Sequence, residues 1–280
     1  SIRNIRNLGY FSEVKVQTLR GSTPEQSVTS VTVREQSTGD FSIGAGYSSL
    51  NKASFSLGIN ERNFLGTGRR LKMGFSTSEE DTDFTIGLTE PYFMERDLSG
   101  SVDIFKRKNK SGDSTINETG LSFGVGFAAA RDVYHRVRYD LSKSKTSVSS
   151  TTATSETGEE SKSLLGSSIA YALSKDTRDS RFDPTEGYFL ELDETFSGLG
   201  GDVKFLRTKF SASYYKPLLF KSVILGLAGE VGHIDGLGDK VTHSKRFYLG
   251  GRSIRGFDGG GIGPRDAGSG DSVGGNTMYS

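Results

Sequence analysis

From Phe41 onward, apolar and polar residues alternate along the chain with a period of two. In the first run, Phe41, Ile43, Ala45 and Tyr47 fall on one face, while Ser42, Gly44, Gly46 and Ser48 fall on the other. Because successive side chains of a β-strand point to opposite faces, this pattern predicts a strand with one apolar face. The same alternation recurs at 53–59, 71–75, 84–88, 121–127, 137–141, 169–173, 188–192, 210–214 and 223–227. We therefore expect about a dozen strands, the last one beginning at Asn276.

The first 35 residues follow a different pattern. Ile2, Ile5 and Leu8 have helical spacing, and valines at 14, 16, 28, 31 and 33 indicate two short strands joined by a polar turn. A helix and two strands are too little for a core of their own. We interpret residues 1–36 as the C-terminal end of a small α+β domain.

The connections between the predicted strands alternate in character. Tight turns are expected near 63–68, 90–97, 131–134, 176–187 and 216–221. More polar and often longer links are expected near 76–83, 106–117, 142–162, 197–202 and from His233 onward. In an antiparallel meander, the tight turns would all lie at one end of the sheet and the long loops at the other, which is typical of outer-membrane barrels.

Strand length separates a membrane barrel from a soluble β-sandwich. Runs such as 120–129 and 164–173 reach the roughly 9–11 residues that cross a bilayer at a tilt, whereas sandwich strands average about five or six. The mean hydropathy of −0.43 does not oppose a barrel, because only every second residue would face lipid. Aromatic residues also cluster beside the tight turns, as at a membrane interface. We predict an all-β, transmembrane, antiparallel up-and-down β-barrel.

Composition and residue spacing offer little support for catalysis. The net charge is +1, from 35 basic and 34 acidic residues, so nucleic acid is not an expected partner. The chain has no cysteine, and its three histidines are scattered. His233, Asp235 and His243 could approach one another, but we favour solvated loop residues over a metal site. The turn with Asp176, Asp179 and Asp183 lacks the order of a calcium loop, which favours a hydrogen-bonded turn. We predict no enzyme activity, catalytic residue, metal or cofactor.

A glycine-rich stretch near the end of the chain carries a family resemblance. It contains FYLGGRSIRGF, GIGPRD and VGGN, and is preceded in the chain by NFLGTG, EPYF, DTRDSRFDPTEG and DGLG at 63–68, 90–93, 176–187 and 235–238. Together these segments resemble the BamA family of outer-membrane protein assembly factors. The leading RNLGYFSEVKV resembles the end of that family's last periplasmic POTRA domain.

The resemblance implies a location, a domain division and a function. Residues 1–36 would end a POTRA domain on the periplasmic side, and 37–280 would form the first 11–12 of sixteen barrel strands, so the chain is expected to be a piece of a longer protein. A loop at 234–275 would fold into the barrel lumen. The protein would fold and insert unfolded β-barrel clients into the bacterial outer membrane, with the lipid bilayer and periplasmic accessory lipoproteins as further partners.

The resemblance also assigns two sets of site residues. In the loop motif Ile254, Arg255, Gly256 and Phe257, Arg255 would form an ion pair inside the lumen with an acidic residue beyond Ser280, and Phe257 would pack against the barrel wall. The first strand, with Phe41, Ile43, Gly44, Gly46 and Tyr47, would form one side of a weak lateral seam. For Gly44 and Gly46, relief of crowding in a curved sheet is an equally good explanation.

Two other functions remain open from the sequence. A two-partner-secretion transporter shares the loop motif and exports a soluble substrate. A general porin or receptor barrel would not need the motif.

Overall fold

The computed structural model describes residues 10–20, 27–48, 52–111, 114–148, 163–181, 183–218, 223–238, 240–251, 253–268, 270 and 272–280. Strands dominate this part of the chain, and none of its helices has the length and apolarity to cross a membrane. A two-stranded hairpin precedes a 12-stranded sheet. The hairpin consists of β1 (Phe11–Arg20) and β2 (Ser27–Glu35).

The 12-stranded sheet runs in chain order from β3 to β14, and each strand is antiparallel to its neighbours. This meander confirms the prediction of about a dozen strands. The strands are β3 (Gly39–Ser48), β4 (Lys52–Phe64), β5 (Arg69–Ser78), β6 (Asp81–Glu90), β7 (Leu98–Ser111), β8 (Ser114–Ala130), β9 (Val133–Val148), β10 (Ser163–Asp176), β11 (Gly187–Ser197), β12 (Phe205–Leu218), β13 (Val223–Gly236) and β14 (Thr277–Tyr279). A short 3-10 helix, η1 (Phe93–Glu95), precedes β7, and another, η3 (His243–Lys245), follows β13.

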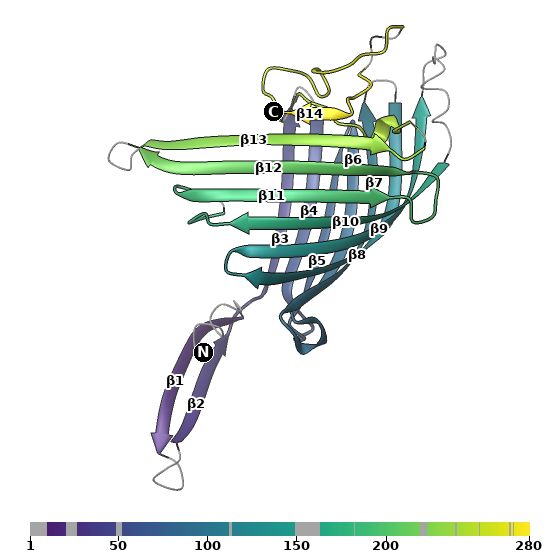
Figure 1. Ribbon diagram of the computed structural model, residues 1–280. Coiled ribbons are helices and arrows are strands. Elements are labelled where there is room, and N and C mark those ends of the chain that lie inside the picture. Colours follow the sequence, from purple (N-terminus) through teal and green to yellow (C-terminus); the bar gives the residue numbers. More distant parts are fainter. Residues whose placement is uncertain are drawn as a thin grey trace.

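The sheet curls into a barrel wall around an open interior, and strands on its two sides cross in projection (Figure 1). Alternating residues along each strand give the wall two different surfaces. The outer surface carries exposed apolar side chains, including Phe55, Ile59, Phe84, Leu88, Val102, Ile104, Phe123, Val125, Val137, Leu141, Ile169, Leu190, Phe210, Tyr214 and Leu227. The inner surface carries Ser, Thr, Gly and charged residues. An apolar exterior around a polar interior is the arrangement of a transmembrane barrel.

The tight turns predicted near 63–68, 90–97, 131–134 and 176–187 lie together at one end of this meander, whereas part of the predicted turn near 216–221 and most of the predicted link near 142–162 lie outside the described residues. At the opposite end, the prediction of longer links was wrong for the two hairpins near 76–83 and 106–117. β5 continues to Ser78 and β6 begins at Asp81, while β7 continues to Ser111 and β8 begins at Ser114. Polar residues continue the strand ladder there, since backbone pairing does not require apolar side chains.

The long connection also begins later than predicted. β13 extends to Gly236, so the connection between β13 and β14 covers 237–276 rather than 234–275. Ile234 is fully buried, and its N–H donates to the Asn276 carbonyl at 2.9 Å. Figure 1 shows this connection, in yellow-green and yellow, at the end of the barrel remote from the β1–β2 hairpin.

The β1–β2 hairpin confirms the two strands predicted near the N-terminus. Val14 pairs with Val33, and Val16 pairs with Val31. The Tyr10 hydroxyl donates to the Gly68 carbonyl at 3.2 Å, which joins the hairpin to the β4–β5 turn. The predicted helix at Ile2, Ile5 and Leu8 lies outside the described residues, so the assignment of 1–36 to a POTRA domain stays a prediction.

Candidate functional site: the first strand, the inner wall and the long connection

The first strand of the barrel sheet has one paired edge and one open edge. β3 pairs with β4 from Gly39–Glu61 to Ser48–Lys52, and no other strand among the described residues pairs with it. Just before this ladder, the Arg62 N–H donates to the Thr38 carbonyl at 3.1 Å, which marks residues 38 and 62 as a hydrogen-bonded pair. Hydrogen-bonded pairs alternate along an antiparallel ladder.

This alternation assigns the backbone groups of β3 to its two edges. Even-numbered residues, including Gly44 and Gly46, direct their N–H and C=O groups toward β4. Odd-numbered residues, including Phe41, Ile43 and Tyr47, direct theirs toward the open edge. Their side chains are also highly exposed on the outer face, at 65%, 64% and 78% respectively. The apolar residues predicted for the seam are therefore the ones with free backbone groups.

Gly44 and Gly46 lie on the inner face, opposite serines of β4. Gly44 is the register partner of Ser56, and a Cβ on Gly44 would lie 2.6 Å from the Ser56 Oγ. The Ser54 Oγ donates to the Gly46 carbonyl at 3.3 Å. These contacts support the explanation that the glycines relieve crowding, and they leave the predicted weakness of the seam untested.

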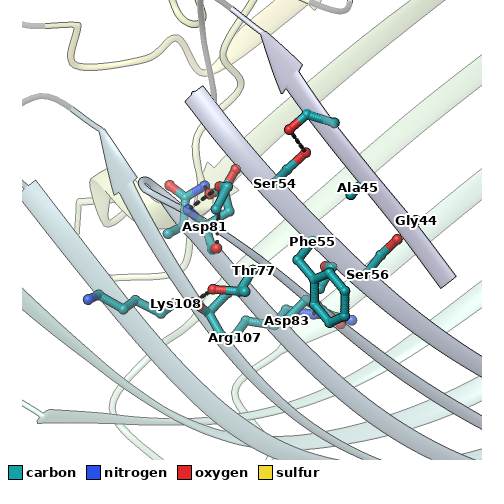
Figure 2. A pocket seen from close by; sticks show the side chains of 15 residues that line it. Gly44, Ala45, Ser54, Phe55, Ser56, Thr77, Asp81, Asp83, Arg107 and Lys108 are labelled. Carbon is teal, nitrogen blue, oxygen red and sulfur yellow. Dashed lines mark hydrogen bonds and ion pairs between the residues drawn. The ribbon is translucent and has the colours of Figure 1, made fainter.

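A groove of about 580 Å³ runs along the inner wall beside β3. Figure 2 shows Ser56 next to Gly44, with Asp83 and Arg107 farther along the groove. The Arg107 Nε lies 3.0 Å from the Asp83 Oδ2. Small side chains therefore line the groove next to the open edge of β3. The ion-paired Asp83 and Arg107 side chains lie farther from that edge, on β6 and β7.

The motif Ile254–Phe257 lies at the tip of the long connection. The Gly251 N–H donates to the Phe257 carbonyl at 2.7 Å, and Gly256 has φ of +90°, a conformation that favours glycine. The Phe257 side chain is 53% exposed, and Arg255 is exposed too. Within the described residues, no carboxylate lies within 4 Å of the Arg255 guanidinium. The predicted ion pair of Arg255 and the packing of Phe257 against the wall therefore stay predictions.

The base of the connection packs against β13. Phe247 lies over Gly232, where a Cβ would come within 2.7 Å of the Phe247 Cζ. Phe247 also packs against a small core of Val203, Phe205, Ile234 and Val241. Backbone hydrogen bonds of 2.9 Å in both directions join Phe247 to Gly275. The connection is thus docked on the inner wall through residues outside its tip motif.

Arg246 ties the two ends of the connection together. Its guanidinium donates to the Val241 carbonyl at 3.0 Å and to the Val273 carbonyl at 3.2 Å. His243 contacts the same Val273 carbonyl through Nδ1 at 3.0 Å.

One contact that sequence reasoning missed joins the connection to the far wall. The Lys245 Nζ lies 3.1 Å from the Glu118 Oε1 of β8, and the Ser142 Oγ of β9 donates to the same oxygen at 3.1 Å. Residues 118 and 245 are 127 positions apart, and no local pattern links them.

The histidines and acidic turn considered in the sequence occupy separate places. His233 lies in β13, where its Nε2 is 3.2 Å from Asp235 and its Nδ1 is 2.8 Å from the Thr277 hydroxyl. His243 lies in the connection, and no group of three or more metal-ligating side chains occurs within the described residues.

The turn containing Asp179 is hydrogen-bonded, as predicted. Asp179 accepts hydrogen bonds from the Ser180, Thr185 and Glu186 N–H groups at 2.9–3.2 Å and from the Thr185 hydroxyl at 2.6 Å. These donors, the hydroxyl foremost, hold the pKa of the Asp179 carboxyl well below its usual value of 3.8.

The curled meander, its apolar exterior and its polar interior with a docked loop define a transmembrane β-barrel protein of the outer-membrane type. The Omp85 superfamily domain model matches residues 63–280. The chain therefore belongs to the Omp85 superfamily.

Individual relatives agree with this assignment. The chain is 28% identical over 280 residues to the outer membrane protein assembly factor BamA of Neorickettsia risticii, covering 99% of this chain and 38% of the relative. Its structure is similar to BamA from Haemophilus ducreyi lacking POTRA domains 1–3, with a TM-score of 0.84, 21% identity, and coverage of 99% and 58% of the two chains. It is also similar to CdiB from Acinetobacter baumannii, with a TM-score of 0.58, 14% identity, and coverage of 93% and 51%. These two structural similarities show the fold alone.

The comparisons identify an integral β-barrel protein of the bacterial outer membrane. The chain spans about two fifths of the length of its BamA relative from Neorickettsia risticii.

Proposed function

We propose that the protein folds and inserts β-barrel proteins into the outer membrane, and that a client strand pairs with the open edge of β3. The observation that carries the proposal is the register of β3 in a chain that belongs to the Omp85 superfamily: its odd-numbered residues direct their N–H and C=O groups away from β4, toward the position of a further strand. Strand addition to an open edge is a general mode of recognition, in which backbone hydrogen bonds supply the affinity. The periplasmic accessory lipoproteins expected from the resemblance would act with the protein in this reaction.

The alternation of β3 suits many clients. Its outer positions are apolar, and its inner positions 42, 44, 46 and 48 are Ser or Gly. A strand from any membrane barrel has apolar and polar residues in the same alternation. When the client strand pairs in the register that aligns its apolar residues with those of β3, the apolar side chains of both strands face lipid. A slip by one residue would turn the apolar side chains of the client toward the barrel interior. The edge of β3 therefore determines which face of a client strand points to lipid, and it does so through the alternation of the client residues rather than through their identity.

The groove beside β3 provides room for the client's inner side chains. Cross-strand neighbours on one face lie about 4.5–5.5 Å apart at Cβ, so bulky residues on β3 would limit which side chains could pair. Gly44 and Gly46 remove that restriction on the inner face. Arg107 of β7 is held by Asp83 of β6, which lies three strands from β3 in sheet order.

The proposal is tested by substituting one backbone donor on the open edge. Ile43→Pro removes an N–H that points away from β4, and proline is tolerated at such positions of an edge strand. Ile43→Ala is the matched control, because it shortens the side chain and keeps the N–H. Both variants are made in the full-length protein, reconstituted into liposomes and supplied with an unfolded client barrel.

We expect Ile43→Ala to speed client insertion as the wild type does, and Ile43→Pro to lower the insertion rate by roughly tenfold, as expected when one or two backbone hydrogen bonds are lost. Retained heat-sensitive gel mobility shows that the variant barrel itself is folded. Equal insertion rates for the two variants would remove β3 as the pairing site. Wild-type liposomes that export a soluble substrate or conduct ions without inserting clients would instead support a two-partner-secretion transporter or a porin.

A further inference from the structure

The contact of Lys245 with Glu118 spans a large part of the barrel wall. The connection leaves the sheet at the end of β13, and Glu118 lies on β8, five strands away in sheet order. Five strand spacings amount to roughly 24 Å along the wall. Phe247, only two residues after Lys245, lies against Gly232 of β13. Neighbouring side chains of the connection therefore contact two distant parts of the wall, and this segment bridges the interior.

The Glu118 carboxylate forms its ion pair with the connection, because the neighbouring arginine on the wall is paired with another carboxylate. Arg107 is the register partner of Glu118 on β7, but its guanidinium is engaged with Asp83 at 3.0 Å. Ser142 supplies a hydroxyl donor from the other side. Within the described residues, the only cation in ion-pair contact with Glu118 is Lys245. Both side chains of this pair are largely shielded from solvent, with exposures of 23% for Lys245 and 21% for Glu118.

We propose that Lys245, Glu118 and Ser142 form a latch that holds the long connection across the barrel interior, and that Arg107 is the competing partner which stabilises Glu118 when the latch opens. In the closed state, Glu118 binds Lys245 while Arg107 binds Asp83. In the open state, Arg107 lies next to Glu118 on the neighbouring strand, so the carboxylate is not left without a counter-charge. Such an exchange of partners gives the connection two alternative states. The latch does not depend on the proposed assembly activity.

Release of the connection is measured by cleavage after Arg246 with an arginine-specific protease. The bond after Arg246 leads into Phe247, which packs over Gly232 of β13, so this site becomes a substrate when the connection leaves the wall. The full-length protein is used in liposomes without a client, and each rate is divided by that of the unfolded protein. Assembly activity is then assayed separately.

We expect Lys245→Gln and Glu118→Gln each to raise the cleavage rate roughly tenfold, as expected when a charge-assisted hydrogen bond is lost. The double exchange Lys245→Glu with Glu118→Lys should return the rate to within about twofold of wild type, because the pair is restored in reverse. Lys209→Gln is the control. It breaks the 2.9 Å pair with Glu230 between β12 and β13, which does not involve the connection, and should leave the rate unchanged.

Asp83→Asn tests the role of Arg107 as competing partner without substituting Lys245, Glu118 or Ser142. It frees Arg107 to pair with Glu118, and cleavage should accelerate; adding Arg107→Gln should reverse that acceleration. If a latch variant fails to fold, this pair of variants still decides the question. Unchanged cleavage in the latch variants, an equal increase with Lys209→Gln, or no rescue by the double exchange would each overturn the latch. If the cleavage results agree with the latch but the wild-type protein does not insert client barrels, the proposed function is contradicted and the latch is not.

Discussion

A methyl group added at Gly232 should release the base of the long connection from the wall. In Gly232→Ala, the new Cβ would lie 2.7 Å from Cζ and 2.9 Å from Cε1 of Phe247. Carbon atoms pack best at about 3.5–4.0 Å, so the ring would have to move by roughly 1 Å. The ring cannot move freely, because Phe247 is fixed to Gly275 by two backbone hydrogen bonds of 2.9 Å.

Overpacking of this kind typically costs about 1–3 kcal/mol. A cost of about 1.4 kcal/mol in the docked state increases the undocked fraction roughly tenfold. We therefore expect cleavage after Arg246 to be about 5- to 150-fold faster in Gly232→Ala than in wild type. The assay is arginine-specific proteolysis of the folded, full-length protein, with the cleavage site identified by mass spectrometry.

Gly74→Ala provides the matched control for this substitution. Gly74 is also a strand glycine on the inner wall, and a Cβ there would meet no atom within 4 Å. It should cleave at the wild-type rate. Equal rates for the two variants would refute the docking of Phe247 in the space above Gly232.

Three further predictions concern the wall, the β10–β11 turn and the tip motif. Gly120→Ala should lower barrel stability by about 1–3 kcal/mol, measured by the temperature at which gel mobility changes, because its Cβ would overlap the buried Phe105 ring; unchanged stability would contradict this packing. Because the pKa of Asp179 is lowered in the folded protein, its ionised carboxylate stabilises the turn fully above about pH 3.8, and this stabilisation is lost progressively as the pH falls below that value. The hydrogen-exchange protection factors of the Thr185 and Glu186 amides should therefore fall from pH 7 to pH 3 in wild type. Asp179→Asn should lower protection at pH 7 and abolish this pH dependence; protection equal to wild type would contradict it. Arg255→Ala in the full-length protein should lower client insertion roughly tenfold if Arg255 forms its expected ion pair, and unchanged growth and insertion would exclude that role.

The sequence was sufficient to predict the strands, because alternation reports directly which residues face lipid and which face the interior. In Phe41–Ser48 it also indicated which side chains are exposed on the outer face. Alternation failed at hairpin ends such as 76–83, where polar residues pair through their backbones as well as apolar ones do. It also placed the end of β13 too early, because Ile234 faces inward and is buried in a small core that Phe205 of β12 and Val241 and Phe247 of the connection form together.

The candidate site was predictable only in part. The tip motif around Arg255 could be found by resemblance, but its contacts depend on residues distant in the sequence. The docking of Lys245 on Glu118 and of Phe247 on Gly232 depends on the curvature of the whole wall. No local spacing encodes these contacts. Likewise, the direction of the Ile43 N–H became apparent only from the register of β3 with β4.

The central claim is that a client strand pairs with the open edge of β3, and site-specific photo-crosslinking tests it most directly. A photoreactive residue replaces Tyr47 on β3 in the full-length protein, and a second variant carries it at Phe123, which is exposed on the outer face of β8. Each is reconstituted with a client barrel whose folding is arrested part-way. We predict crosslinks to the client from position 47 and none from position 123. Crosslinks of equal yield from both positions, or from position 123 alone, would contradict pairing at β3.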